Sequence, residues 1–237
     1  MLGRRAALCM TVLALVLGSA VTGGAVRVRA QEGAWEFAVG APGCGRVALI
    51  FNIGMGYEAR MGTLDFLVTA GVPATVFPMG EWAQNNPGLV ASMANQGFVV
   101  GSHGDQGIPL TWRSDWEIAQ DVRDAHWSIE SALGFPPAPY FTPFAADRDD
   151  RVRSIVAAEG YVPVGWDVSS ADWTWDASPT SVYDNVMGNV YDGAIVEFHL
   201  DAPNTVGSTE VALPWIVNDL WARGYSFVTV PELAVGC

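Results

Sequence analysis

Hydrophobic and polar positions along the chain repeat one pattern: a helical segment, a glycine, and a short apolar segment. This pattern occurs four times, with Gly71, Gly97, Gly160 and Gly224 at its centre. A glycine just past a helix readily adopts the left-handed conformation that ends the helix. Each glycine therefore marks a helix end before a predicted strand, at 74–77, 98–101, 161–166 and 225–230.

Helix starts carry signals of their own. Asn86-Pro87 and Ser178-Pro179 each pair a cap residue with proline at the first helical position. Ser114 and Glu117 have the spacing of a capping box. We therefore predict that helices begin at Pro87, Asp115 and Pro179.

Further apolar segments at 46–51, 140–142 and 193–199 bring the predicted strands to seven. Apolar strands that alternate with helices pair in parallel and are covered by those helices. Seven such units favour an α/β barrel, or a strongly curved sheet, over an open doubly wound sheet.

The first 30 residues have the pattern of a secretory leader. Arg4 and Arg5 precede an apolar run over 6–20, and Val28-Arg29-Ala30 is a small-residue cleavage site. We predict a signal peptide over 1–30, an N-terminal extension over 31–45 and one domain over 46–233. After cleavage no stable membrane insertion is expected; a retained N-terminal anchor is the alternative.

Charge excludes one class of partner. The chain has 12 Lys+Arg and 25 Asp+Glu. Four of the cations and none of the acids lie in the leader, so the remainder carries 8 − 25 = −17. Such a surface repels nucleic acid and anionic lipid. We therefore expect no nucleic-acid partner.

Two cysteines remain outside the leader, Cys44 before the first strand and Cys237 at the end. In an exported chain such a pair can form a disulfide. If the first and last strands are neighbours, this bridge would close nearly the whole chain into one loop. A loop of that size is worth ~4–5 kcal/mol in the loop-entropy model. The sequence leaves that proximity open.

In parallel α/β folds the chemistry lies at the carboxyl ends of the strands. The predicted ends are 52–54, 101–105, 141–144, 166–168 and 197–201, and they hold two of the three histidines, His103 and His199. Taken in order, these segments resemble the motifs of polysaccharide deacetylases, the NodB-like domain of carbohydrate esterase family 4.

That resemblance covers about 46–233 and implies a distorted (β/α)7 barrel that removes acetyl groups from N-acetylated or O-acetylated sugars. It also implies a mechanism. A divalent metal held by one aspartate and two histidines polarises the acetyl carbonyl and activates water. A second aspartate is the general base, and a histidine on a late strand protonates the leaving group.

The first two motifs depart from the family pattern. Where the family has T-F-D-D-G, Asn52 occupies the base position and Ile53 the metal-ligand position. Neither side chain can take over the carboxylate's role. In H-[S/T]-x-x-H, His103 is kept but Gly107 replaces the second ligand. Catalytic zinc needs three protein donors, so we expect no metal cofactor. Zinc would bind only if the site were rebuilt, with Asp105 as a replacement ligand.

The later motifs keep more of the pattern. Phe141 replaces an arginine, whereas Asp172 and Trp173 remain. The resemblance gives His199 the leaving-group acid position, while Glu197 replaces a leucine that would line an acetyl pocket. The substrate-binding candidates are Tyr140, Phe144, Trp173 and Glu197.

Tryptophans suit a sugar site, because their flat faces stack on the C–H faces of sugar rings. Trp166, Trp173 and Trp175 gather at one strand end, whereas Trp112 and Trp116 are expected to serve packing.

Glu197 and His199 point to the same face of their strand, and that proximity would raise the histidine pKa. Without a G-x-S-x-G serine, metal-free acid/base catalysis ranks below glycan binding.

The sequence therefore predicts an exported or cell-envelope protein of the deacetylase family. We expect it to be inactive or impaired as a metal-dependent enzyme and to bind glycan in the former active-site groove. Two alternatives stay open: an active deacetylase with a rebuilt metal site, and a non-enzymatic structural or partner-binding envelope protein.

Overall fold

A computed structural model describes residues 35–237 of the chain, so the predicted leader lies outside the described residues. The strands are β1 (Arg46–Ile53), β2 (Thr75–Pro78), β3 (Val99–Val100), β4 (Tyr140–Phe141), β5 (Val162–Pro163), β6 (Val168–Ser169), β7 (Ile195–His199) and β8 (Ser226–Val228). The helices are α1 (Met61–Ala70), α2 (Gly80–Asn85), α3 (Pro87–Asn95), α4 (Asp115–Leu133), α5 (Asp150–Ala158), α6 (Pro179–Asn189), α7 (Thr209–Ala222) and α8 (Val230–Ala234).

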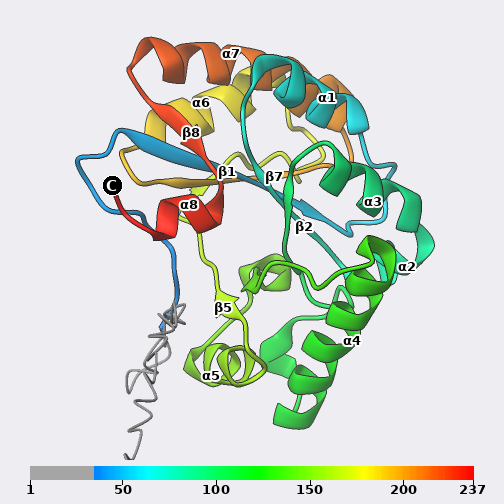
Figure 1. Ribbon diagram of the computed structural model, residues 1–237. Coiled ribbons are helices and arrows are strands. Elements are labelled where there is room, and N and C mark those ends of the chain that lie inside the picture. The colour runs from blue at the N-terminus through cyan, green and yellow to red at the C-terminus, as the bar shows by residue number, and fades with distance from the viewer. Residues whose placement is uncertain (1–34) are drawn as a thin grey trace, which may run out of the picture. The chain divides into compact units, whose positions relative to one another are not determined.

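All pairs between the named strands are parallel, whereas the isolated bridge of Val39 to Ala194 is antiparallel. The central strand is β1. The main sheet has the order β3-β2-β1-β7-β6, and β8 also pairs with β1. Strands β4 and β5 form a second pair, which an isolated bridge between Ser102 and Phe141 joins to the end of β3. The result is the distorted α/β barrel that the sequence predicts, with helices around a curved sheet (Figure 1).

Strand β6 is the one strand of the described chain that the sequence analysis did not separate. It has only two residues and follows β5 closely, so no glycine or helix marks it as a new unit. It matters because it pairs with β7 and sets Ser169 directly beside Glu197.

The two faces of β1 build two different cores. Val47, Leu49, Phe51 and Ile53 pack in the large apolar cluster between sheet and helices. Ala48 and Ile50 belong instead to the cluster inside the barrel, as the two-residue period of a strand requires. By the same alternation Asn52 lies on the interior face, next to the open end of the barrel.

The N-terminal segment is part of the barrel wall. Phe37 bridges to Val164 beyond β5, and Val39 bridges to Ala194 at the start of β7. The Phe37 ring is buried in the interior cluster. The described part of the predicted extension therefore fills the interval between β5 and β7.

Cys44 and Cys237 form a disulfide with a Cα–Cα distance of 5.7 Å. The condition that the sequence analysis set for this bridge is met, because β8 lies beside β1 with Arg46 opposite Ser226. Within residues 35–237, no helix has the length and apolar character needed to cross a membrane.

The predicted helix boundaries agree with the structure. The four glycines predicted to end helices, at positions 71, 97, 160 and 224, have positive φ between 67° and 93°. Helices α3, α4 and α6 begin at the predicted residues, and Ser114 and Glu117 form the capping box of α4. Asn86 differs: its side chain donates to the Trp82 carbonyl and does not cap α3.

Candidate functional site

A cavity of about 470 Å³ opens at the carboxyl ends of the strands. Its walls are apolar and include Ile53, Met55, Met79, Phe144, Trp166 and Trp173. Its polar side chains are Asn52, His103, Ser169, Glu197 and His199. They come from β1, β6, β7 and the segment after β3, as expected for parallel strands that end at one edge.

His103 is fixed by Thr142, which in turn holds Asn52. The Nδ1 atom of His103 lies 3.0 Å from the Thr142 carbonyl oxygen and 2.8 Å from its Oγ1. Thr142 Oγ1 donates to Asn52 Oδ1 at 3.0 Å. The hydroxyl proton is therefore used, and a carbonyl can only accept, so Nδ1 carries the imidazole proton. The lone pair of His103 then resides on Nε2.

His103 is neutral. Burial and the charge of His199 lower the pKa of His103 to about 3, against a smaller opposing effect of the Thr142 carbonyl. Asn52 has an incomplete set of partners. Its Nδ2 is a buried donor without an acceptor at hydrogen-bond distance, although the Asn52 amide lies close enough to Glu197 to lower that carboxyl's pKa.

The residues at the family's metal positions do not fit a metal. Ile53 is fully buried in the apolar cluster. Gly107 has no side chain to donate, although a Cβ there would meet the Phe144 ring at an ordinary contact distance of 3.6 Å. Across residues 35–237, no group of three His, Cys, Asp or Glu side chains is placed to hold an ion. Among the described residues, His103 therefore has no second and third side chain beside it to complete a metal site.

Asp105 does not complete a set of metal ligands with His103. It lines a different groove, beside Arg113, Asp121 and α4. Burial and the charges of Asp121 and Asp124 raise the pKa of Asp105 to about 6. As a replacement ligand for His103, Asp105 would have to leave this position, so the structure gives that expectation no support.

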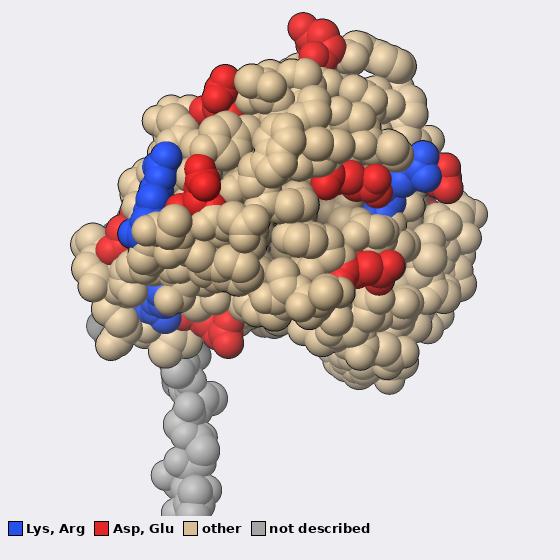
Figure 2. Space-filling model, turned by 90° about the horizontal axis from the view of Figure 1, so that it is seen from above, with Lys and Arg blue, Asp and Glu red and all other residues tan. Residues whose placement is uncertain are grey.

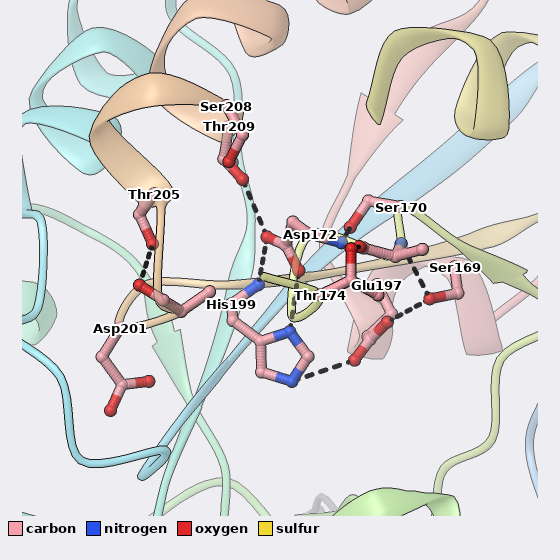
Figure 3. A network of polar contacts seen from close by, with 12 residues as sticks. Ser169, Ser170, Asp172, Thr174, Glu197, His199, Asp201, Thr205, Ser208 and Thr209 are labelled. Carbon is pink, nitrogen blue, oxygen red and sulfur yellow. Dashed lines mark hydrogen bonds and ion pairs between the residues drawn. The ribbon is translucent and has the colours of Figure 1, made fainter. Parts of the chain in front are cut away.

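His199 lies between two acids (Figure 3). Its Nδ1 is 2.8 Å from Asp172 Oδ1, and its Nε2 is 3.2 Å from Glu197 Oε1. Asp172 Oδ2 also accepts the His199 backbone N–H at 2.9 Å and the Thr209 hydroxyl at 2.8 Å. On the far side, Ser169 donates to Glu197 Oε2 at 2.7 Å. Both imidazole nitrogens of His199 are therefore occupied by protein groups.

This arrangement keeps His199 charged. Burial would lower the pKa of His199, but the charges of Glu197 and Asp172 outweigh it and raise the pKa to about 9. Burial raises the pKa of Glu197, and His199 opposes that rise. Asp201 is also buried; its carboxylate accepts from the backbone N–H groups of Gly54 and Gly56, while burial raises its pKa.

The predicted substrate-binding residues separate into two groups. Phe144, Trp173 and Glu197 line the cavity. Tyr140 does not; it packs against the interior cluster of the barrel. The prediction that Trp112 and Trp116 serve packing is wrong, because these side chains are 79% and 69% exposed.

Sequence reasoning missed several residues of the site. Thr142 and Ser169 stand at strand ends and so satisfy the rule that selected the others, but a lone hydroxyl there carries no motif of its own. Met79 follows β2 directly and lines the cavity. Thr209 comes from α7 and reaches Asp172 only through the tertiary fold; no sequence signal identifies it.

The surface agrees with the composition. In Figure 2 acidic side chains outnumber basic ones on the face shown, and most of that face is uncharged. The cavity itself has no Lys or Arg among the described residues that line it.

The sequence matches the polysaccharide deacetylase family over residues 40–164. Its relative PgdA, a peptidoglycan-N-acetylglucosamine deacetylase of Listeria monocytogenes, is 32% identical over 189 residues, 79% of this chain and 38% of the relative. The chain thus spans well under half of that relative's length. It belongs to the polysaccharide deacetylase family, the NodB-like group of carbohydrate esterase family 4.

Solved structures of the same family have the same fold as this chain. The peptidoglycan N-acetylglucosamine deacetylase Bc1960 superposes with a TM-score of 0.79 at 25% identity, covering 86% of this chain and 94% of that chain. BA3943 of Bacillus anthracis, described as a pseudoenzyme of the family, gives 0.77 at 25% identity, with coverage of 84% and 68%. A mutant of BA3943 with restored enzymatic activity gives 0.77 at 26% identity.

Proposed function

We propose that this protein is an exported relative of the peptidoglycan deacetylases that binds glycan in the cavity and lacks ordinary metal-dependent deacetylase activity. One observation carries the proposal: the positions for the base and for two of the three metal ligands hold Asn52, Ile53 and Gly107. Without them neither the water nor the acetyl carbonyl is activated, and those two effects supply most of the rate in metal-assisted hydrolysis.

The surroundings of His199 support the same conclusion. A general acid must present its proton to the leaving group. Here the Nε2 proton is directed to Glu197, and a pKa of about 9 makes His199 a weak acid near neutral pH. BA3943 offers a precedent for loss of activity on this fold, and its restored mutant indicates that such a loss can be reversed.

Glycan binding is supported by the shape and lining of the cavity. Concave apolar sites with a few fixed polar groups are the usual form of small-ligand sites. Trp173 is half exposed and lines the cavity, so one indole face can stack on a sugar ring. PgdA and Bc1960 are peptidoglycan N-acetylglucosamine deacetylases, and a wall glycan is therefore the proposed ligand class.

Metal content and acetate release test the loss of activity. We expect the purified protein to hold no stoichiometric zinc and to release no acetate from acetylated chitooligosaccharides or peptidoglycan. The triple variant Asn52→Asp, Ile53→Asp, Gly107→His is the matched control, since it restores the base and both missing ligands. Stoichiometric zinc with steady acetate release by the unmodified protein would establish the alternative, an active enzyme with a rebuilt site.

Retention on insoluble peptidoglycan or chitin tests the binding role. Trp173→Ala should weaken retention about tenfold, as expected for loss of one stacked ring. Trp112→Ala should leave it unchanged, because Trp112 is more exposed than Trp173 and lies outside the cavity. If neither glycan retains the unmodified protein, the remaining alternative is a structural or partner-binding envelope protein.

A further inference from the structure

Two acids and one histidine form the polar side of the cavity and its support. When Asp172, Glu197 and His199 are all ionised, two negative charges share one positive charge, which leaves 1 − 2 = −1. Asp201 is a further buried acid near this group, since its charge raises the His199 pKa. The described residues that line the cavity add no Lys or Arg.

The arginine near the cavity wall does not balance this charge. Arg148 lies over the Trp166 ring, 5.9 Å from its centroid. Its guanidinium already pairs with Glu36, with Nε 2.6 Å from Oε1 and Nη2 3.2 Å from Oε2. Asp172 and Glu197 therefore share the single cation His199, and a bound cation would balance the remaining negative charge.

The walls suit a cation that is attached to a ring. Trp166, Trp173 and Phe144 place three aromatic rings around the cavity. Aromatic faces attract ammonium groups through the ring quadrupole, and they also stack on the C–H face of a sugar. An acetamido methyl placed against Glu197, which is 3% exposed, would bring no charge to compensate the carboxylate.

Two side chains that line the cavity, Asn52 and His103, each have a hydrogen-bonding atom without a protein partner among the described residues. Asn52 is 1% exposed, and its Nδ2 is a donor without an acceptor. The His103 lone pair on Nε2 is an acceptor, because Nδ1 is held by Thr142. Neutral hydroxyl groups on a sugar can satisfy both, since a hydroxyl donates and accepts.

We propose that the cavity selects glycans whose amino sugar carries a free ammonium group over glycans whose amino sugar is acetylated. In this assignment Glu197 receives the ammonium, Trp173 stacks on the ring, and Asn52 and His103 bond to hydroxyls. The inference rests on the proposed glycan-binding function and names its ligand: the kind of sugar that a deacetylase would produce.

Calorimetry with two matched probes tests this preference. The probes are the glucosamine tetramer and its fully N-acetylated counterpart, at physiological salt and at a pH where the amines are protonated. We expect the unmodified protein to bind the amine tetramer at least about tenfold more tightly, as one desolvated ion contact would give. Glu197→Gln should remove that preference and leave binding of the acetylated tetramer unchanged or improved.

Asp184→Asn is the charge-matched control. It removes the same unit of charge from an exposed position on α6, outside the cavity, so it should not alter the preference. Equal losses in the two variants would assign the preference to the overall acidity of the protein and overturn the proposal.

The unmodified protein decides the question even if a variant fails to fold. Equal or tighter binding of the acetylated tetramer would refute the amine preference while leaving glycan binding intact. Binding of neither tetramer would remove the proposed function, and this inference with it.

Discussion

At the scale of single residues, the cavity holds two histidines in opposite protonation states. His103 donates from Nδ1 to Thr142 and is surrounded by apolar walls, so burial keeps it neutral. His199 is equally buried but contacts Asp172 and Glu197, whose charges keep it protonated. The difference comes from the partners and not from the depth of burial.

We predict that the two histidines titrate far apart and far from the ordinary pKa of 6.5. The imidazole signals followed by NMR should show a pKa near 9 for His199 and no protonation of His103 above about pH 4, given its pKa of about 3. A His199→Gln variant assigns the signals. Titration of His199 near 6.5 would contradict the ion-pair arrangement.

The same values fix two trends in stability. The folded-state pKa of His199 lies above its unfolded value, so its contribution is complete below about pH 6.5 and is lost as pH rises through about 9. That loss is on the order of 3 kcal/mol if the whole shift is realised. For His103 the folded-state pKa is lower, so its contribution is lost as pH falls from 6.5 toward 3. Urea unfolding at several pH values measures both trends.

Much of the site could be predicted from the sequence, because strand alternation and the strand-end rule depend on local pattern. Those rules placed Glu197 beside His199 and brought Asn52 and His103 to the same edge. They could not predict Thr142 between His103 and Asn52, since that contact joins side chains from separate strands. They also could not predict that Asp105 turns toward α4.

At the scale of elements, each helix boundary depends on one or two residues. In α4, the Ser114 hydroxyl accepts from the Glu117 backbone N–H at 3.4 Å, and Glu117 Oε2 accepts from the Ser114 N–H at 2.8 Å. This exchange satisfies donors that the first helical turn leaves free. The hydrogen bonds from Ser114 lower the pKa of Glu117.

We predict that Ser114→Ala lowers the free energy of unfolding by about 1 kcal/mol, the usual value of an N-cap. Ser131→Ala, near the end of the same helix, is the control and should be neutral or slightly stabilising, because alanine favours helix interiors. Chemical denaturation with a shared baseline compares the two variants. An equal effect at both positions would contradict the capping role.

Elements marked by a glycine, a cap or an apolar run could be predicted even where the strand is short, as for β3, β4 and β5. The helices that begin at Pro87, Asp115 and Pro179 each carry such a signal. Strand β6 has two residues, no preceding helix and a tertiary pairing with β7 that no local pattern indicates. Residues 35–39 likewise join the barrel through isolated bridges that no periodicity indicates.

At the scale of the whole molecule, the first and last strands are neighbours, and Cys44 and Cys237 join the chain beside them. The two cysteines are 193 residues apart in sequence. The loop-entropy model attributes such a bridge to restriction of the unfolded chain. The cavity lies at the opposite, carboxyl ends of the strands.

We predict that the double variant Cys44→Ala, Cys237→Ala loses about 5 kcal/mol of stability while glycan binding at low temperature is unchanged. Urea unfolding of the variant, compared with the unmodified protein under reducing and oxidising conditions, measures the loss. The reduced unmodified protein should resemble the variant. A loss of binding in folded variant protein would show that the bridge also shapes the cavity.

The Cys44–Cys237 disulfide also affects what proteolysis does to the protein. If a protease cleaves the backbone once between residues 45 and 236, the Cys44–Cys237 disulfide still links the two fragments covalently. The barrel strands of a nicked molecule therefore remain each other's nearest partners and can re-form their pairings as an intramolecular reaction. A single cut of this kind would therefore leave the assembled molecule in place.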